Sequence, residues 1–295
     1  MQTATFFTPS YRGDLERAVW MRRSVRRFFN GESTHIFAVP KRDISMFQRA
    51  MGNDTALQFV TQESLVDKYF YPDALHRLTA NLAPSQLWRL KRHAGRPGWI
   101  IQQIAKLNCA GAVNTDAVIF LDSDLVFFRS FDLAALGLGQ SIRTMVRITP
   151  ETEGARHREH LRTSRQLLGL AEGSTEHTYM GYPAIWYCDW IDALQQHLQN
   201  VHSLPWQEAL YQAGHISEYT LYGAFVDEVV QPANLHHKTA PFNRIAWDHP
   251  SFDALRADAL ASLPPGDEIS LVIQSNIGIE PSDYLDLLTK LVGYA

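Results

Sequence analysis

The first half of the chain alternates short apolar runs with longer stretches in which apolar residues recur at helical spacing. Short apolar runs bounded by polar turns predict strands, and the periodic stretches predict helices between them. This alternation is typical of a mostly parallel sheet with helices on its faces. The predicted strands cover residues 3–8, 35–39, 57–60 and 117–121, and the predicted helices cover residues 15–29, 44–51 and 98–110.

The second half is less regular, because clusters of Gly, Pro and aromatic residues separate its apolar stretches. Helical spacing predicts helices over residues 190–201, 206–212 and 282–292, and an apolar run predicts a last strand over 269–274. No low-complexity linker divides the chain. We therefore expect one α/β domain over residues 1–295.

Two carboxylates follow the most apolar predicted strand, residues 117–121. A continuous apolar run is typical of a central strand covered on both faces, and ligands of α/β folds bind at the carboxyl ends of such strands. In an extended segment Asp122 and Asp124 point to the same side, where both could reach one Mg²⁺ or Mn²⁺. The alternative is a pair of solvated turn carboxylates.

Composition and charge narrow the function classes. The chain has 295 residues, of which 45% are hydrophobic and 20% charged, which excludes disorder, collagen and coiled coil. The net charge is −4, from 27 basic and 31 acidic residues, so no global charge favours nucleic acid or an acidic membrane. Any bound anion must therefore be held by local contacts and not by the net charge of the chain.

The expected location is the cytoplasm. Cys109 and Cys188 are too few for a disulfide framework, and the sequence predicts neither a signal peptide nor a membrane-spanning stretch. A cationic side of the predicted helix 15–29 is expected to be solvated, with peripheral contact to the inner face of the membrane as an alternative. Its residues, with Arg12 just before the helix, are Arg12, Arg17, Arg22, Arg23, Arg26 and Arg27.

The stretch TDAVIFLDSDLVFFRSFD resembles the DxD segment of GT-A glycosyltransferases, in which a divalent metal holds a nucleotide-sugar diphosphate. The order of motifs is similar to that of a poorly characterised bacterial branch. The resemblance implies a single GT-A-like domain with a mostly parallel central sheet flanked by helices. It also implies a nucleotide-sugar-binding half, residues 1–135, and an acceptor-binding half, residues 136–295. Further similar segments are FFTPSYRGDLERAVWMRRSVRRF, GWIIQQIAKL, HTYMGYPAIWYCDWIDAL and SEYTLYGAFVDEV.

The resemblance implies donor-binding roles for particular residues. Asp122 and Asp124 match the metal and ribose-diphosphate positions, and Ser123 lies between them. Lys106 is a candidate counter-charge for the diphosphate, with Gln102 and Gln103 as neighbours on the helix; the alternative is a surface lysine. The matching nucleotide-binding turn consists of Thr8, Pro9, Ser10 and Tyr11.

Tyr11 could stack on the base or be a buried turn tyrosine. UDP-sugars are the first expectation for the donor, on superfamily frequency. Gly181 could mark a close approach of the backbone to the donor sugar. Packing is favoured over carbohydrate contact for the neighbouring aromatic residues Tyr179, Tyr182, Trp186 and Trp206.

A transfer reaction also needs a base and a complete metal shell. Glu218 is the candidate general base, because a carboxylate at a comparable late position has this role in inverting GT-A enzymes. The alternatives are a helix-capping role for Ser217-Glu218, or Asp227 or Glu228 as the base. The resemblance implies a C-terminal histidine as third metal ligand, for which His237 is favoured and His236 is the alternate; a structural histidine is the other interpretation.

The expected function is a metal-dependent, inverting transfer of a sugar from a nucleotide-sugar to a carbohydrate or glycolipid hydroxyl, in bacterial surface glycan assembly. Two alternatives stay open. The segment VIFLDSDLVF also resembles the motif of haloacid-dehalogenase-like phosphatases, in which Asp122 would be the nucleophile. The other alternative is a nucleotide-sugar binder without turnover.

Overall fold

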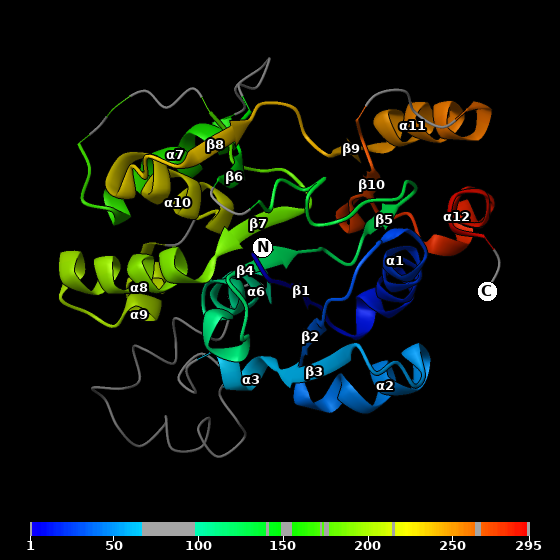
Figure 1. Cartoon of the computed structure of the whole chain (residues 1–295), viewed down its shortest axis with the longest axis horizontal. Helices are drawn as coiled ribbons and strands as arrows, with labels where there is room; N and C mark the ends of the chain where they lie inside the picture. Colours follow the sequence, from blue (N-terminus) through cyan, green and yellow to red (C-terminus); the bar gives the residue numbers. More distant parts are fainter. Residues whose placement is uncertain are drawn as a thin grey trace.

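The computed structural model describes residues 2–66, 98–139, 142–148, 155–171, 173, 177–213, 216–262 and 267–293. Its centre is a five-stranded sheet in the order β3-β2-β1-β4-β7 (Figure 1). The first four strands are parallel, and only β7 runs antiparallel to its neighbour β4. The strands are β1 (Ala4–Pro9), β2 (His35–Val39), β3 (Leu57–Thr61), β4 (Ala117–Phe120) and β7 (Ala184–Tyr187).

Helices surround this sheet, which confirms the predicted fold class. Those of the first half are α1 (Leu15–Phe28), α2 (Ile44–Met51), α3 (Gln62–Leu65) and α6 (Gly98–Leu107). Those of the second half are α7 (Ala155–Leu167), α8 (Cys188–His202), α9 (Trp206–Ala213), α10 (Glu218–Phe225), α11 (His249–Ala261) and α12 (Leu285–Val292). In the described ranges, none of them has both the length and the apolar character to cross a membrane.

The core lies on both faces of β1 and β4. Every residue of these two strands is buried, as continuous apolar runs in a doubly covered parallel sheet require. Phe7 of β1 packs edge-on against Phe120 of β4, and Phe120 packs in turn against Trp186 of β7. The carboxyl ends of β1 and β4 are therefore held rigidly side by side.

Two smaller sheets bring the second half of the chain to these strand ends. One has the order β5-β10-β9, formed by β5 (Leu125–Phe127), β10 (Ser270–Ile273) and β9 (Asn243–Ala246). The other pairs β6 (Arg143–Val146) with β8 (Leu235–Lys238). Because β5 follows the aspartate pair directly and pairs antiparallel with β10, a segment from near the C-terminus lies beside that pair.

Short helical turns complete the described structure. Two of them, η1 (Arg12–Asp14) and η2 (Lys41–Asp43), follow the ends of β1 and β2. A π-helical turn, η4 (Val226–Val230), extends α10. The remaining 3₁₀ turns are η3 (Ala110–Ala112), η5 (Ser275–Ile277) and η6 (Pro281–Tyr284).

The expectation of a solvated arginine face on α1 is wrong for two of its members. Arg17 and Arg22 are 5% and 7% exposed. Arg17 donates to the carbonyl oxygen of Ile279, and Arg22 forms an ion pair with Asp54 at 2.6 Å. Segments distant in sequence supply hydrogen-bond and ion-pair partners that offset the cost of burying the two guanidinium groups. Helical spacing alone could therefore not reveal this burial.

Candidate active site

The aspartate pair lies in a tight turn between β4 and β5. The backbone N–H of Leu125 donates to the carbonyl oxygen of Asp122 at 3.1 Å, which closes the turn. The expectation of an extended Asp-Ser-Asp segment is therefore wrong, because the chain reverses here to enter the smaller sheet. Asp122 and Asp124 both remain at the carboxyl end of the central sheet.

Lys106 of α6 lies at the centre of a buried polar cluster and is 4% exposed. Its ammonium group donates to Asp122 Oδ1 at 2.9 Å, to Glu218 Oε1 at 3.0 Å and to the Tyr219 hydroxyl at 2.6 Å. The interpretation of Lys106 as a surface lysine is thus wrong. An ammonium group has three N–H donors, so all of them are used.

The electrostatics of Lys106 follow from these contacts. Burial lowers the pKa of Lys106, but the carboxylates of Asp122 and Glu218 outweigh burial and raise this pKa above its ordinary value. Burial also raises the pKa of the Tyr182 and Tyr219 hydroxyls, and the charge of Asp122 adds to both shifts. The lysine stays charged and the two tyrosines stay neutral.

Among the described residues, one carboxylate oxygen of Asp124 has a hydrogen-bond partner and the other has none. Its Oδ2 accepts a hydrogen bond from the backbone N–H of Ser275 at 3.1 Å, while its Oδ1 is buried without a hydrogen-bond partner. Burial and the nearby charge of Asp122 raise the pKa of Asp124 to about 7. A buried carboxylate oxygen of this kind is stabilised by a cation, so the pair fits the predicted divalent metal.

The predicted nucleotide-binding turn divides into buried and exposed parts. The Thr8 hydroxyl is buried against His35 Nε2 at 2.9 Å, and Pro9 is buried as the last residue of β1. Ser10 accepts a hydrogen bond from the Ser123 hydroxyl at 2.8 Å, which ties this turn to the aspartate turn. Tyr11 is 46% exposed, so the interpretation as a buried tyrosine is wrong.

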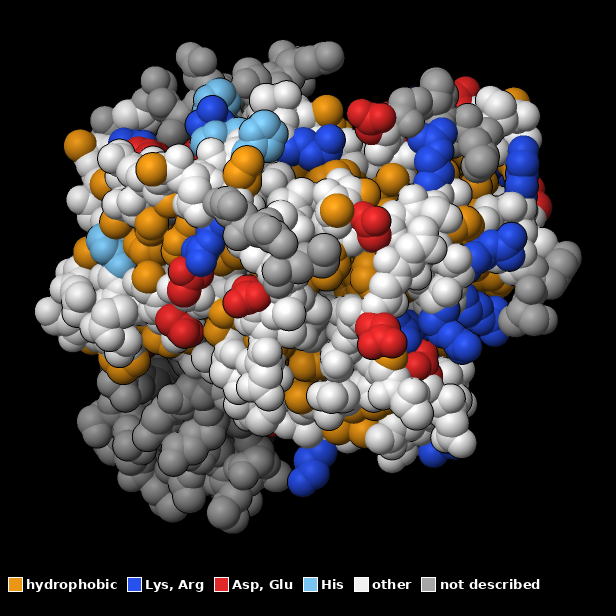
Figure 2. All heavy atoms as spheres, in the orientation of Figure 1, with side chains coloured by type: hydrophobic (Ala, Val, Ile, Leu, Met, Phe, Trp, Pro, Cys, Tyr) orange, Lys and Arg blue, Asp and Glu red, His pale blue; other side chains and the backbone are white. Residues whose placement is uncertain are grey.

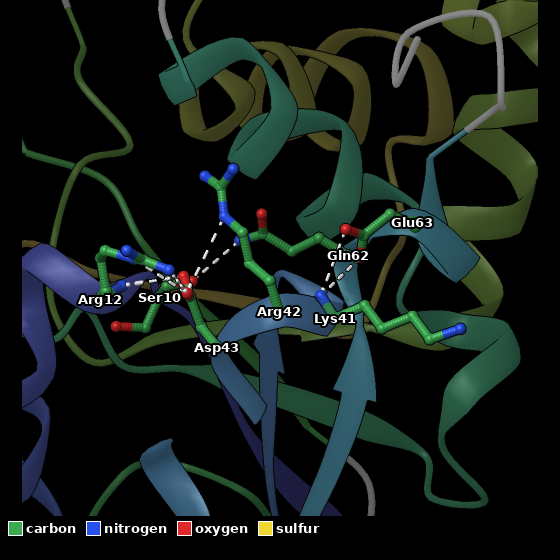
Figure 3. A network of polar contacts seen from close by, with 7 residues as sticks. All are labelled: Ser10, Arg12, Lys41, Arg42, Asp43, Gln62 and Glu63. Carbon is green, nitrogen blue, oxygen red and sulfur yellow. Dashed lines mark hydrogen bonds and ion pairs between the residues drawn. The ribbon is translucent and has the colours of Figure 1, made fainter. Parts of the chain in front are cut away.

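A second polar network lies next to this turn (Figure 3). The Asp43 carboxylate is buried and accepts from the Arg12 backbone and from its guanidinium at 2.9 Å. Gln62 donates to the carbonyl oxygens of Ser10 and Ala38. Asp43 and Gln62 were not predicted as site residues from the sequence, although both follow strands that end at the same edge of the sheet as β1.

Glu218 is the first residue of α10, and its neighbour Ser217 caps this helix. The Ser217 hydroxyl accepts from the backbone N–H of Thr220 at 3.4 Å. Glu218 is buried and is bound by Lys106. The capping interpretation therefore holds for Ser217, while the Glu218 carboxylate belongs to the cluster around Lys106.

The other predicted base and ligand residues form a separate cluster beyond the end of α10. His237 Nε2 lies 2.6 Å from Asp227 Oδ1, and Asp227 Oδ2 accepts from the Tyr179 hydroxyl at 2.8 Å and from Arg147 at 3.3 Å. Glu228 pairs with Arg165. Among the described residues, no three His, Cys, Asp or Glu side chains form a metal-binding group. Neither His237 nor its neighbour His236, which is exposed, thus joins the aspartate pair in this structure, and the third-ligand role stays a prediction.

The remaining predicted donor contacts are closely packed. A Cβ atom on Gly181 would lie 2.6 Å from Val146 Cγ1, so packing already requires a glycine there. Gln103 is buried on α6 and its Oε1 has no hydrogen-bond partner. The aromatic residues Tyr179, Tyr182, Trp186 and Trp206 are all buried, as the packing interpretation predicts.

The chain belongs to a family of unknown function, DUF6492, whose model matches residues 5–294. A sequence search of curated proteins found no match. Among solved structures, the apo form of mouse xyloside xylosyltransferase 1 is similar with a TM-score of 0.52 at 14% identity, covering 94% of this chain and 100% of the other. Galactosyltransferase LgtC in complex with donor and acceptor sugar analogs has a TM-score of 0.49 at 12% identity, covering 99% and 97%. The first likeness shows a glycosyltransferase fold of the GT-A type.

Proposed function

For a DUF6492 member with this fold, we propose sugar transfer from a nucleotide-sugar donor to a hydroxyl of a carbohydrate or glycolipid acceptor. The observation that carries the proposal is the buried ammonium of Lys106, bound by both Asp122 and Glu218 at the carboxyl end of β4. It fixes a candidate donor-binding carboxylate and a candidate base relative to each other. Fixed geometry of reacting groups is a main source of rate enhancement.

Charge balance supports a divalent cation as part of this site. Among the described residues, the carboxylates of this group are Asp14, Asp122, Asp124, Glu218 and Glu280, and the cations are Lys106 and Arg17. Five carboxylates and two cations give a formal charge of −3, which repels a diphosphate. Asp122 and Asp124 would hold the ion, and Mg²⁺ or Mn²⁺ would neutralise the diphosphate and stabilise it as a leaving group.

The hydrogen bonds of the Lys106 ammonium change the role proposed for this residue. Its three donors are occupied, so it could bind a diphosphate only by releasing Asp122, Glu218 or Tyr219. Lys106 is better placed to position the two carboxylates. We assign stacking on the nucleobase of the donor to the exposed Tyr11. The Tyr11 ring packs over Gly13, since a Cβ atom on that glycine would lie 2.6 Å from the ring.

The proposed chemical step places Glu218 at the acceptor. Its Oε1 is bound by Lys106, and its Oε2 is the atom to which an acceptor hydroxyl would give its proton as that oxygen attacks the donor sugar. The bond from the sugar to the diphosphate then breaks, and the configuration inverts. A uridine nucleotide, and an acceptor of bacterial surface glycans, are the first donor and acceptor classes to test.

Product analysis with a panel of nucleotide-sugars and Mn²⁺ tests the proposal. A donor that binds should raise the melting temperature of the protein, and transfer should release nucleoside diphosphate in step with acceptor consumption. Release of inorganic phosphate from a monoester would support the phosphatase alternative instead. Saturable binding without product, in both wild-type protein and Glu218→Gln, would indicate a binder.

A further inference from the structure

The second half of α1 lines a cavity of about 470 Å³ that takes no part in the proposed reaction. Its charged lining consists of Arg22, Arg23, Arg26 and Arg27, together with a single carboxylate, Asp54. The formal charge of this lining is therefore +3, on a chain whose net charge is −4. The volume lies within the range of small-ligand pockets, roughly 300–1,000 Å³.

Two of the arginines are held in place by the protein itself. Arg22 is buried and donates to Asp54 Oδ2 at 2.6 Å and 3.1 Å. Arg27 donates to the carbonyl oxygen of Val292, the last residue of α12, at 2.8 Å. The walls of the cavity are thus joined by contacts between α1, the Asp54 loop and the C-terminal helix.

Among the described residues, the side chains of the other two arginines, Arg23 and Arg26, donate no hydrogen bond to the protein. Arg26 is 65% exposed and approaches Asp54 only to 3.9 Å. Arg23 lies over the Trp20 ring at 5.0 Å and, within the described ranges, has no carboxylate at ion-pair distance. Figure 2 shows Lys and Arg side chains gathered on this side of the molecule, beside the C-terminal end of the chain.

We propose that this cavity binds a phosphate group through Arg23 and Arg26. Guanidinium groups bind phosphate oxygens through paired N–H donors, and the excess positive charge favours an anion over a neutral ligand. The cavity is a separate site, because Arg23 to Arg27 lie nine to thirteen residues beyond Asp14 on a helix that rises 1.5 Å per residue, roughly 13–20 Å. The phosphate belongs either to a free ion or to a lipid headgroup.

The test compares the whole chain with Arg23→Gln/Arg26→Gln, and with Arg162→Gln as the matched control from the exposed face of α7. Melting temperatures and circular dichroism establish that all three are folded. Each is titrated, without divalent cations, with inorganic phosphate and with phosphatidylcholine vesicles that contain or lack phosphatidylglycerol. We expect the double variant to lose binding by about tenfold or more, since each arginine near an anionic surface contributes about 1 kcal/mol, and the control to bind like wild type.

The two titrations distinguish the sources of the phosphate. Binding of inorganic phosphate that vesicles do not strengthen assigns a free ion, whereas binding confined to phosphatidylglycerol vesicles assigns a headgroup. The proposal is overturned if wild type binds neither probe, if the double variant binds as tightly as wild type, or if Arg162→Gln loses as much affinity as the double variant.

Discussion

Two carboxylates, one at the start of α10 and one in the π-turn that extends this helix, each lie in a polar cluster, but their surroundings differ. Glu218 at the start is buried, and its Oε1 is bound by the Lys106 ammonium. Asp227 in the π-turn is bound on both oxygens, by His237 on one and by Tyr179 and Arg147 on the other. Among the described contacts, one oxygen of Glu218 and both oxygens of Asp227 are bound, so Glu218 is the less constrained of the two carboxylates.

The largest expected effect distinguishes the proposed metal ligands, Asp122 and Asp124, from the cluster around Asp227. Asp122→Asn or Asp124→Asn should each abolish metal-dependent donor binding, because a two-oxygen chelate loses its charge and geometry when one arm is changed. Asp227→Asn should retain this binding. The measurement is the shift in melting temperature caused by donor plus Mn²⁺. A wild-type shift in either variant of the aspartate pair would contradict the metal assignment.

Removal of the cation from each cluster is expected to have the next largest effect. Lys106→Met leaves Asp122 and Glu218 without their shared cation, and breaking such a buried pair lowers the free energy of unfolding by about 3–5 kcal/mol. Arg147→Met removes a partly exposed cation from Asp227 and should lower it by about 1 kcal/mol or less. Urea denaturation measures both. Equal losses would show that the two clusters do not differ in burial energetics.

A test of the base follows. Glu218→Gln removes the proton acceptor but keeps the shape of the side chain, so turnover should fall by roughly 10²-fold or more while donor affinity is retained. Asp227→Asn should leave turnover per folded molecule within about threefold of wild type, a range set by ordinary structural perturbation. Steady-state kinetics, with melting temperatures as a folding control, measure both effects. Near-wild-type turnover in Glu218→Gln would move the base to another residue or favour a retaining mechanism.

The smallest expected effect concerns the pH dependence of stability and the buried His35. His35 is fully buried, and burial, with the charge of Arg22 added, lowers its pKa well below the ordinary value. The folded state therefore holds it neutral, so stability is present above its unfolded pKa of about 6.5 and is lost as the pH falls below that value, by up to about 1.4 kcal/mol per pH unit. The free energy of unfolding measured from pH 7 to pH 5 should fall less steeply in His35→Gln. An unchanged slope in His35→Gln would contradict the assignment of this pH dependence to His35.

Local pattern predicted most of the elements up to β4, whereas it did not predict β5, β6, β8, β9, α7 or α11. The strand 35–39 and the helix 44–51 coincide with β2 and α2, because their apolar residues follow one period and polar turns bound them. The antiparallel direction of β7 was not predicted, since periodicity carries no information on strand direction. The division of the chain near residue 135 stays a prediction.

The two aspartates of the candidate site were predictable from the sequence, but the contacts between the residues of the site were not. Asp122 and Asp124 stand out because they follow a continuous apolar run. The contact of Lys106 with Glu218 joins residues 112 positions apart, and a single sequence does not encode such a pairing in any local pattern. The burial of Arg17 was missed for the same reason, because its partners Ile279 and Glu280 lie near the other end of the chain.

The pairing of β10 with β5 also has a consequence for biosynthesis. The Ser275 backbone that binds Asp124 and the strand that braces the aspartate turn are both made about 150 residues after that turn. A domain generally folds as a unit during synthesis. The last strand of the central sheet, β7, ends at residue 187, whereas the carboxylate pair acquires its final geometry only when residues 270–275 emerge. The carboxylate pair is therefore completed only after every strand of the central sheet has been made.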